Sequence, residues 1–470
     1  MLGIGCWTCP FSQMGILLCQ NNLETKKLSV IEMTIGIRIS FTSSTSVIMF
    51  PSSRSPSLSW FLFVLIALPV LIGCQAPEPQ NRVGLDMSTS SSDLGQWKAL
   101  DSALNRAVLE NTLPGAVLLT ARDGRVVAHK AYGHANPLTG QEMDTSSLFR
   151  ICSQSKAITA TAALILWEKG ALELDDPVSQ YIPEFAETGI LDSVYADSSF
   201  STLPNPTPLT IRHLMTHTSG LPYGEIGDPR FEKLYAQADV VDLFPRDGRS
   251  TLDNAKKLGN LALIHAPGQR WNYSLGLDVL VAVIEVASGR PYAAFVEEEL
   301  FLPLGMTNTH FAVPQSDCPR LTEVMTPADS PSGWKPHTHP VYTTDYPRHP
   351  EWPLCSGGAG LTSTAEDYAR FLQMHLDGGL GPNGRLLRKA TIDTIMADHA
   401  AGLLDGPWRQ GLAFGVKHSE PGTGRFFWSG YFNTQYFADP TTRELTVLMK
   451  QTYGLQHDPS SGPFGELLWN

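Results

Sequence analysis

Two serine–lysine pairs in the chain have a spacing that suits nucleophilic catalysis. Ser153 and Lys156 form one S-x-x-K tetrapeptide, and Ser332 and Lys335 form the other. On a helix, residues at i and i+3 share one face, with Cβ atoms about 5–6 Å apart. A serine hydroxyl is a weak nucleophile until a base takes its proton, and a lysine whose pKa is lowered can assist in that step.

The residues around each pair separate the two matches. Ser153 opens a strongly apolar helical pattern over 156–169, which Gly170 ends. Free N–H groups at such a helix start favour negative charge on an attacked oxygen. Ser332 follows a proline in a loop rich in Pro and His, which does not hold two side chains in register. Taken alone, the first tetrapeptide also fits a helix cap followed by a surface lysine.

The elements that must position this pair follow from the hydrophobic periodicity. Apolar residues at helical spacing predict helices over 96–110, 277–288 and 365–376. Two apolar runs, 116–121 and 125–132, flank an Arg-Asp-Gly turn and predict a hairpin. Near the end of the chain, 426–439 and 444–452 have strand patterns joined by a Pro-Thr-Thr-Arg turn.

Strands at both ends of the chain, with helices between them, favour one arrangement. We expect an α/β fold of the α+β type. In it, a single antiparallel sheet is built from both chain ends and flanked by helices, and a mostly helical lobe lies beside it. The two lobes would form one catalytic module over 95–470 rather than two successive domains.

Several stretches in order along the chain resemble the β-lactamase and penicillin-binding-protein superfamily of serine hydrolases. The approach to Ser153 reads FRICS, and S-x-x-K is a motif of that superfamily. The resemblance extends over about 95–455 and is closest to the class C β-lactamase and family VIII carboxylesterase branch. Its other matching stretches are LELDDP at 172–177, YIP at 181–183, LTIRHLMTHTSGL at 209–221, PG at 267–268, YS at 273–274 and GGAGLTST at 357–364.

The resemblance implies a tyrosine base at Tyr273. The family's second motif is Y-x-N, and the matching position reads Tyr273-Ser274-Leu275, so the tyrosine is kept and the asparagine is replaced. Lys156 would stabilise the phenolate, because a nearby cation lowers the pKa of a phenol. A literal Y-x-N occurs at 431–433, but it lies within the late strand pattern and is interpreted as a chance match.

The family's third motif, usually K-T-G or H-x-G, matches Trp428-Ser429-Gly430, which would contact the substrate. An indole N–H is a single neutral donor and binds a carboxylate less well than a cation does, which favours neutral esters. The backbone N–H groups of Ser153 and Tyr431 would form the oxyanion hole. The family often has Gly shortly after this motif, where this chain has Asn433.

Together these features predict a serine hydrolase that cleaves carboxylic esters through an acyl-enzyme on Ser153, with Lys156 and Tyr273 as the base. A small-molecule ester or amide is the expected substrate, and no metal or cofactor is needed. A β-lactamase or D-alanyl-D-alanine carboxypeptidase is an alternative on the same fold. A sensor or pseudoenzyme that does not turn over is an alternative of another class, because the motif Asn and the Lys or His are missing.

The first part of the chain predicts export and a lipid anchor. Residues 58–73 form an apolar run after Arg54, and Leu-Ile-Gly-Cys at 71–74 resembles a bacterial lipobox. We expect 49–73 to be a signal peptide, Cys74 to be lipidated, and 74–94 to be a flexible tether. Met49 opens a well-formed signal, so 1–48 is interpreted as a mis-assigned extension. The predicted location is the bacterial cell envelope, facing the periplasm, and Gln75 favours the outer membrane.

The net charge and the histidine and cysteine residues bear on nucleic-acid binding, metal binding and disulfide formation. The net charge is −12, without a run of Lys or Arg, so nucleic acid is not an expected partner. The histidines His213, His217, His337 and His339 are interpreted as structural rather than as metal ligands. Cys152 is interpreted as a small buried residue. Whether Cys318 and Cys355 pair, and how many copies of the chain associate, remains open.

Overall fold

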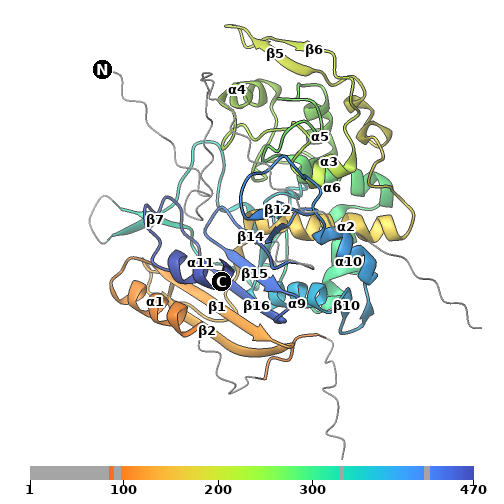
Figure 1. Ribbon diagram of the computed structural model, residues 1–470. Coiled ribbons are helices and arrows are strands. Elements are labelled where there is room, and N and C mark those ends of the chain that lie inside the picture. Colours follow the sequence, from red (N-terminus) through yellow and green to blue (C-terminus); the bar gives the residue numbers. More distant parts are fainter. Residues whose placement is uncertain (1–83, 89–96, 329–332, 418–423, 470) are drawn as a thin grey trace, which may run out of the picture. The chain divides into compact units, whose positions relative to one another are not determined.

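Strands from both ends of the described chain meet in one antiparallel sheet (Figure 1). The computed structural model describes residues 84–88, 97–328, 333–417 and 424–469. Among them, the large sheet is 8-stranded in the order β12-β13-β14-β15-β16-β1-β2-β3. Its strands are β1 (Gly115–Arg122), β2 (Arg125–Asn136), β3 (Gln141–Glu142), β12 (Trp408–Gln410), β13 (Gly415–Lys417), β14 (Phe426–Ser429), β15 (Gln435–Asp439) and β16 (Glu444–Met449).

The pairing of β1 with β16 joins the two ends of the chain. Leu119 lies opposite Val447 in this antiparallel pair, and both side chains are buried. Asp123 and Gly124 form the turn between β1 and β2, and both have positive φ (51° and 72°), as a tight hairpin turn requires. The predicted α/β fold with a sheet built from both chain ends is therefore confirmed.

Helices cover both faces of this sheet. The N-terminal helix α1 (Trp97–Leu109) and the C-terminal helix α11 (Ser461–Trp469) pack together on one face. On the other face, α9 (Ala365–Leu376) packs against β1, β15 and β16. The helix α9 has the predicted bounds, because Thr364 caps its first turn by accepting a hydrogen bond from the Asp367 N–H.

A mostly helical lobe adjoins the sheet, as predicted (Figure 1). In it, α6 packs against α2, α3 and α5. The apolar helix α2 begins directly after the Ser153 turn and is buried along almost its whole length. The helices of this lobe are α2 (Ser155–Glu168), α3 (Ile211–Met215), α4 (Pro229–Ala238), α5 (Thr251–Gly259) and α6 (Gly276–Ser288).

Several shorter elements complete the described chain. Small two-stranded pairs are β4 (Phe149–Arg150) with β9 (Thr362–Ser363), β5 (Ile190–Val194) with β6 (Phe200–Leu203), β7 (Met325–Pro327) with β8 (Trp334–Pro336), and β10 (Leu380–Gly381) with β11 (Gly384–Arg385). The remaining helices are α7 (Tyr292–Val296), the π-helix η5 (Glu297–Phe301), α8 (Leu302–Leu304) and α10 (Lys389–Met396). Single 3₁₀ turns are η2 (Cys152–Gln154), η3 (Val178–Gln180), η4 (Pro183–Phe185), η6 (Cys318–Arg320) and η7 (Tyr346–Arg348).

The predicted late strand pattern over 426–439 is divided into two strands. β14 ends at Ser429, the chain turns at 430–434, and β15 begins at Gln435. Asn433 has a φ of 67°, a left-handed conformation that glycine and asparagine tolerate. This conformation explains why Asn can stand where the family often has Gly.

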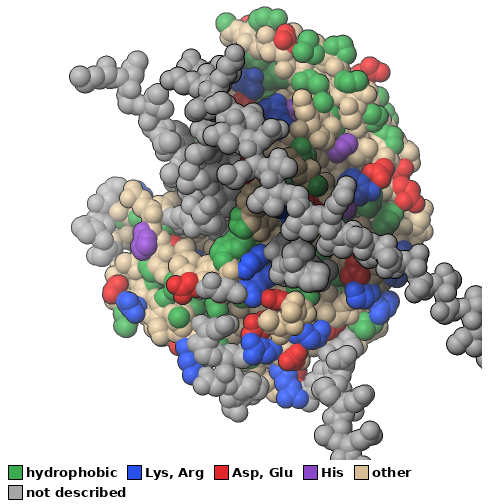
Figure 2. Space-filling model, viewed as in Figure 1, with side chains coloured by type: hydrophobic (Ala, Val, Ile, Leu, Met, Phe, Trp, Pro, Cys, Tyr) green, Lys and Arg blue, Asp and Glu red, His purple; other side chains and the backbone are tan. Residues whose placement is uncertain are grey.

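The membrane and export predictions concern residues that the structure does not describe. The predicted signal peptide, Cys74 and most of the tether lie outside the described residues. Within the described ranges, no single helix is long and apolar enough to cross a bilayer, although α6 with 292–304 passes that test as a pair bent by 80°. On the face drawn in Figure 2, Lys and Arg side chains are interspersed with Asp and Glu side chains.

Candidate active site

Ser153 lies in a tight turn between the short strand β4 and the apolar helix α2. The preceding residue, Cys152, has a φ of 47°, so a non-glycine residue adopts a left-handed conformation directly before the serine. The single turn η2 then leads into α2, which begins at Ser155. Ser153 is 9% exposed, so its hydroxyl lies at the edge of the protein interior.

Lys156 and Tyr273 converge on the Ser153 hydroxyl. The Tyr273 hydroxyl lies 2.6 Å from Ser153 Oγ, and Lys156 Nζ donates to the same oxygen over 3.3 Å. Tyr273 comes from the loop before α6, 120 residues away in sequence. A separation of 2.6 Å between two hydroxyl oxygens is within the range for direct proton transfer. The arrangement can therefore remove and return the serine proton.

The Lys156 ammonium group is enclosed by neutral acceptors. Its side chain is 0% exposed and donates to the Tyr223 hydroxyl over 3.0 Å and to the Gly358 carbonyl over 2.8 Å. Burial lowers the pKa of Lys156 from its ordinary 10.5 to about 7, and the negative charge of Asp278 opposes this decrease. A lysine with a pKa near neutrality can exchange its proton with the serine and the tyrosine.

Aromatic rings hold Tyr273 from several sides. Its ring stacks on Tyr223 at 5.4 Å and on Trp428 at 6.2 Å between centroids, and His217 packs against it at 4.6 Å. Lys156 Nζ lies 4.7 Å from the centroid of the Tyr273 ring. The cation thus contacts the face of the phenol, an electrostatically favourable position.

The turn after β14 approaches the backbone just before Ser153. A methyl group on Gly430 would lie 2.2 Å from Thr434 Oγ1 and 2.4 Å from the Ile151 carbonyl oxygen, so this position requires glycine. The Thr434 hydroxyl donates to that carbonyl over 3.2 Å. Residues Trp428, Ser429, Gly430 and Tyr431 are therefore carried on a strand end and turn that border the nucleophile.

Two of the three departures from the family pattern, Leu275 and Asn433, are defined by their burial and contacts. Leu275 is 0% exposed, so it belongs to the core and offers no polar group to a substrate. Asn433 occupies the turn, where its amide donates to Thr452 Oγ1 over 2.8 Å. Of the alternative S-x-x-K pair, Ser332 is outside the described residues and Lys335 lies on β8, which pairs with β7.

The three cysteines within the described ranges are separate buried thiols. Burial raises the pKa of the Cys152 thiol to about 12, so this group stays protonated although it adjoins Ser153. Cys318 and Cys355 are both free and buried. Cys318 packs in a small cluster with Leu148, whereas Cys355 lies beside α5.

The histidines make structural contacts. The His213 ring bonds to Thr210 in the capping box of α3, and the His217 ring bonds to Ser274. His337 contacts the Tyr342 hydroxyl, and His339 Nε2 lies 2.9 Å from a carboxylate oxygen of Glu225. Among the described residues, no group of three or more His, Cys, Asp or Glu side chains is placed to hold a metal ion.

Sequence reasoning missed two residues that build this site. Tyr223 follows the recognised HTSGL stretch by two positions, and Asp278 follows Tyr273 by five. In sequence, Tyr223 reads as an ordinary aromatic residue of a loop. Asp278 reads as an ordinary acidic residue in the first turn of a helix. Their proximity to Lys156 arises from the packing of α6 and its neighbouring loops, which the chain order alone does not reveal.

Relatives of the chain share this region. A family model described as Beta-lactamase matches residues 100–463. The esterase EstB of Burkholderia gladioli is 33% identical over 403 residues, which cover 81% of this chain and 96% of EstB. Protein Rv1367c of Mycobacterium tuberculosis is 30% identical over 366 residues, covering 74% of this chain and 86% of the relative.

Solved structures agree with this assignment. EstCE1, described as a hydrolase with promiscuous acyltransferase activity, superposes with a TM-score of 0.67 at 26% identity, covering 81% of this chain and 100% of EstCE1. The simvastatin synthase LovD of Aspergillus terreus has the same fold, with a TM-score of 0.67 at 20% identity and coverage of 80% and 98%. The chain therefore belongs to the beta-lactamase family and is a serine hydrolase.

Proposed function

We propose that the protein hydrolyses carboxylic esters through a covalent acyl-enzyme on Ser153. The observation that carries this proposal is the 2.6 Å contact between the Tyr273 hydroxyl and Ser153 Oγ, with Lys156 Nζ bonded to the same oxygen. The likeness to EstB adds support, because that relative is named an esterase and matches 96% of its own length.

In this proposal, Ser153 Oγ attacks the acyl carbon while its proton passes to the pair formed by Tyr273 and Lys156. The backbone N–H groups of Ser153 and Tyr431 stabilise the oxyanion. The alcohol leaves with the proton, and Ser153 remains acylated. Water then attacks the acyl carbon, gives its proton to the same pair and releases the acid, so that the serine regains its proton.

The nature of the third motif favours neutral esters over substrates that carry a carboxylate. Trp428 occupies the position where β-lactam-cleaving relatives place a cation, and its indole packs in the aromatic wall beside Tyr273. An indole supplies one neutral donor rather than a positive charge. A β-lactamase or a D-alanyl-D-alanine carboxypeptidase remains the alternative within this family.

The decisive experiment compares the parent with Ser153→Ala and with the matched control Ser332→Ala. The parent and Ser332→Ala should hydrolyse short-chain p-nitrophenyl esters, and Ser153→Ala should not. Turnover by Ser153→Ala at the parent rate would contradict the proposal. Nitrocefin hydrolysis as fast as ester hydrolysis would favour the β-lactamase alternative.

A fluorophosphonate probe tests the alternative of another class. Labelling of Ser153 without ester turnover would indicate a sensor that remains acylated. Absence of labelling at Ser153 would indicate a pseudoenzyme.

We also propose that the hydrolase domain, 95–470, is held at the bacterial envelope by a lipid on Cys74, after removal of a signal peptide at 49–73. The support is the lipobox-like sequence at 71–74 and the polar tether that follows it. Metabolic labelling with a radioactive fatty acid should mark the parent and not Cys74→Ser. Detection of any peptide from 1–48 in cells would contradict the assignment of Met49 as the start.

A further inference from the structure

Asp278 is a half-buried residue, and its two carboxylate oxygens differ in their hydrogen bonds. Oδ1 accepts from the Ser356 hydroxyl over 2.6 Å and from the Gly358 N–H over 3.2 Å. Oδ2 is also buried and receives no hydrogen bond from the residues that the structure describes. A buried carboxylate oxygen without a hydrogen bond is costly, so another interaction must compensate for it.

Gly358 links this carboxylate to the active-site lysine. Its N–H donates to Asp278, and its carbonyl accepts from Lys156 Nζ. A methyl group on Gly358 would lie 2.4 Å from Asp278 Oδ2, 2.7 Å from the Tyr223 hydroxyl oxygen and 3.2 Å from Lys156 Nζ. The carboxylate, the phenol and the ammonium group therefore gather around one glycine Cα.

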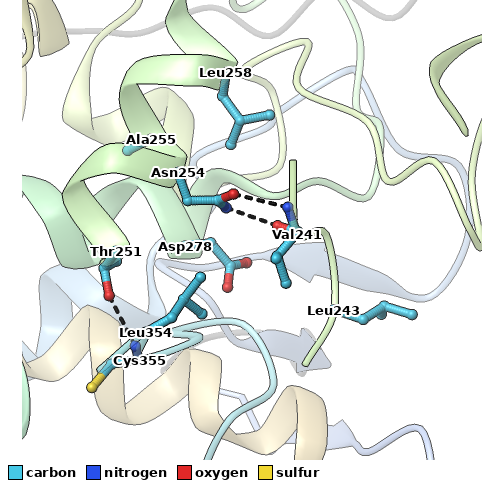
Figure 3. Close-up of a pocket in the computed structure, with 9 residues that line it drawn as sticks. All are labelled: Val241, Leu243, Thr251, Asn254, Ala255, Leu258, Asp278, Leu354 and Cys355. Carbon is cyan, nitrogen blue, oxygen red and sulfur yellow. Dashed lines mark hydrogen bonds between the residues drawn. The ribbon is translucent and has the colours of Figure 1, made fainter. Parts of the chain in front are cut away.

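The other side of Asp278 faces a small cavity. The space is about 10 Å³, on the scale of about one water molecule. In Figure 3 the Asp278 carboxylate points into the region between α5, Val241 and Leu354. The lining is otherwise mostly apolar, and Asn254 is committed to both backbone groups of Val241. The opposite charge that acts on Asp278 is that of Lys156.

We propose that Asp278 is a positioning residue, the counter-charge of Lys156, which also orients the Gly358 carbonyl that binds the ammonium group. The proposal rests on the proposed function, because it assigns a task to the base that acts on Ser153. The hydrogen bonds that the structure shows for Asp278 go to Ser356 and Gly358 and not to Ser153. It acts by keeping a proton on Lys156 that burial alone would remove.

The charges around the pair are consistent with this assignment. Burial raises the pKa of Asp278, whereas the Lys156 ammonium and the bonds from Ser356 and Gly358 oppose this increase. Reciprocally, Asp278 opposes the effect of burial on Lys156. The other titratable groups that face the pair are Cys152, His217, Tyr223, Asp242 and Tyr273.

The test is the pH dependence of two reactions of the full-length protein with Asp278→Asn. Both kcat/KM for a p-nitrophenyl ester and the rate of fluorophosphonate labelling of Ser153 are measured across pH. In each pH profile, one limb follows the ionisation of Lys156. We expect this limb to move to lower pH by about one unit or more, because a neighbouring carboxylate raises the pKa of an ammonium group by that amount. Glu285→Gln, which removes a carboxylate farther along α6, should leave the limb in place.

A purely structural role would lower the rate without moving the limb, and an unmoved limb overturns the inference. If Asp278→Asn does not fold, Ser356→Ala decides, because it removes one bond to the carboxylate and should move the limb less but in the same direction. If the parent is labelled at Ser153 but the pH profile of the variant is not shifted, this inference is wrong and the proposed function is unaffected. A parent that is never labelled at Ser153 defeats both the proposed function and this inference.

Discussion

Two lysines are 0% exposed in the described part of the chain, and they differ in what surrounds the ammonium group. Lys156 donates to a serine, a phenol and a carbonyl, all of them neutral. Lys450, at the end of β16, bonds directly to the Asp458 carboxylate and to Ser460. Burial alone would raise the pKa of Asp458, but the Lys450 ammonium group holds this pKa below its usual value.

The comparison separates a lysine in a buried ion pair from a buried lysine whose pKa is lowered. A carboxylate in direct contact keeps a buried ammonium group charged, and the pair then serves packing and position. Neutral acceptors leave a buried ammonium group with a lowered pKa, which suits proton transfer. The same residue type at the same burial thus has two tasks, and its partners determine which.

The largest expected difference between the two sites is in activity. Lys156→Met should reduce kcat/KM for an ester by roughly 10²–10⁴-fold, the usual contribution of general acid–base catalysis. Lys450→Met should retain nearly the parent rate per folded molecule. Circular dichroism gives the fraction of folded protein for both variants. Equal losses of activity would contradict the comparison.

The next difference is in stability. Lys450→Met should lower the free energy of unfolding by about 3–5 kcal/mol, because it leaves the Asp458 carboxylate buried without a counter-charge. Denaturant unfolding monitored by tryptophan fluorescence measures this change. The double variant Lys450→Met/Asp458→Leu should recover most of the loss, since it removes both charges. A double variant as unstable as the single one would show that the ion pair is not the cause.

The pH dependence of stability should distinguish the sites further. Since the pKa of folded Lys156 is about 7 and its ordinary value is 10.5, the unfolded chain binds more protons between these values. The free energy of unfolding is therefore highest, as far as Lys156 is concerned, above pH 10.5. It decreases as the pH falls from 10.5 toward 7, because the buried lysine resists protonation. Asp458, whose pKa is lowered, contributes stability that is lost only as the pH falls below the usual range of an aspartate.

Unfolding of the parent and of Lys156→Met between pH 6 and 11 tests this statement. The difference in the free energy of unfolding between the two proteins should change by a few kcal/mol between pH 7 and pH 10.5. It should be constant below pH 7 and above pH 10.5. A constant difference would contradict the lowered pKa of Lys156.

The smallest expected effect concerns the second phenol. Tyr223→Phe removes the 3.0 Å bond from Lys156 to the Tyr223 hydroxyl and keeps the ring that stacks on Tyr273. We expect kcat/KM to fall by about tenfold, in line with the loss of one hydrogen bond to a charged group. Tyr235→Phe is a matched control, because that hydroxyl bonds to a backbone carbonyl in the same lobe. An equal loss in both variants would assign the effect to packing.

The features that could be predicted from sequence are those with local causes. The helix α9 was predicted with its observed bounds because an amphipathic pattern follows a threonine cap. The Ser153–Lys156 pair could be predicted because side chains at i and i+3 share one face and because the surrounding stretches resemble the family. The division of 426–439 into β14 and β15 was not predicted, since the turn depends on how closely Gly430 approaches Ile151.

The rest of the candidate site depends on tertiary approach. Tyr223 and Asp278 gain their importance from their proximity to Lys156, and no local pattern marks them. The left-handed conformation of Cys152 has no signal either, because cysteine is not a residue that favours positive φ. The short strands β12 and β13 were missed for a related reason, since each has too few residues to display a period.

The bond from Thr434 to the Ile151 carbonyl has a consequence for biosynthesis. A ribosome delivers Ser153, Lys156 and Tyr273 well before it delivers Thr434, so the nascent polypeptide carries the three reactive side chains without the anchor for the segment that presents the serine. The pairing of β1 with β16 likewise waits for the last part of the chain. The segment that presents Ser153 therefore reaches its final contacts only after the last strands of the sheet have been synthesised.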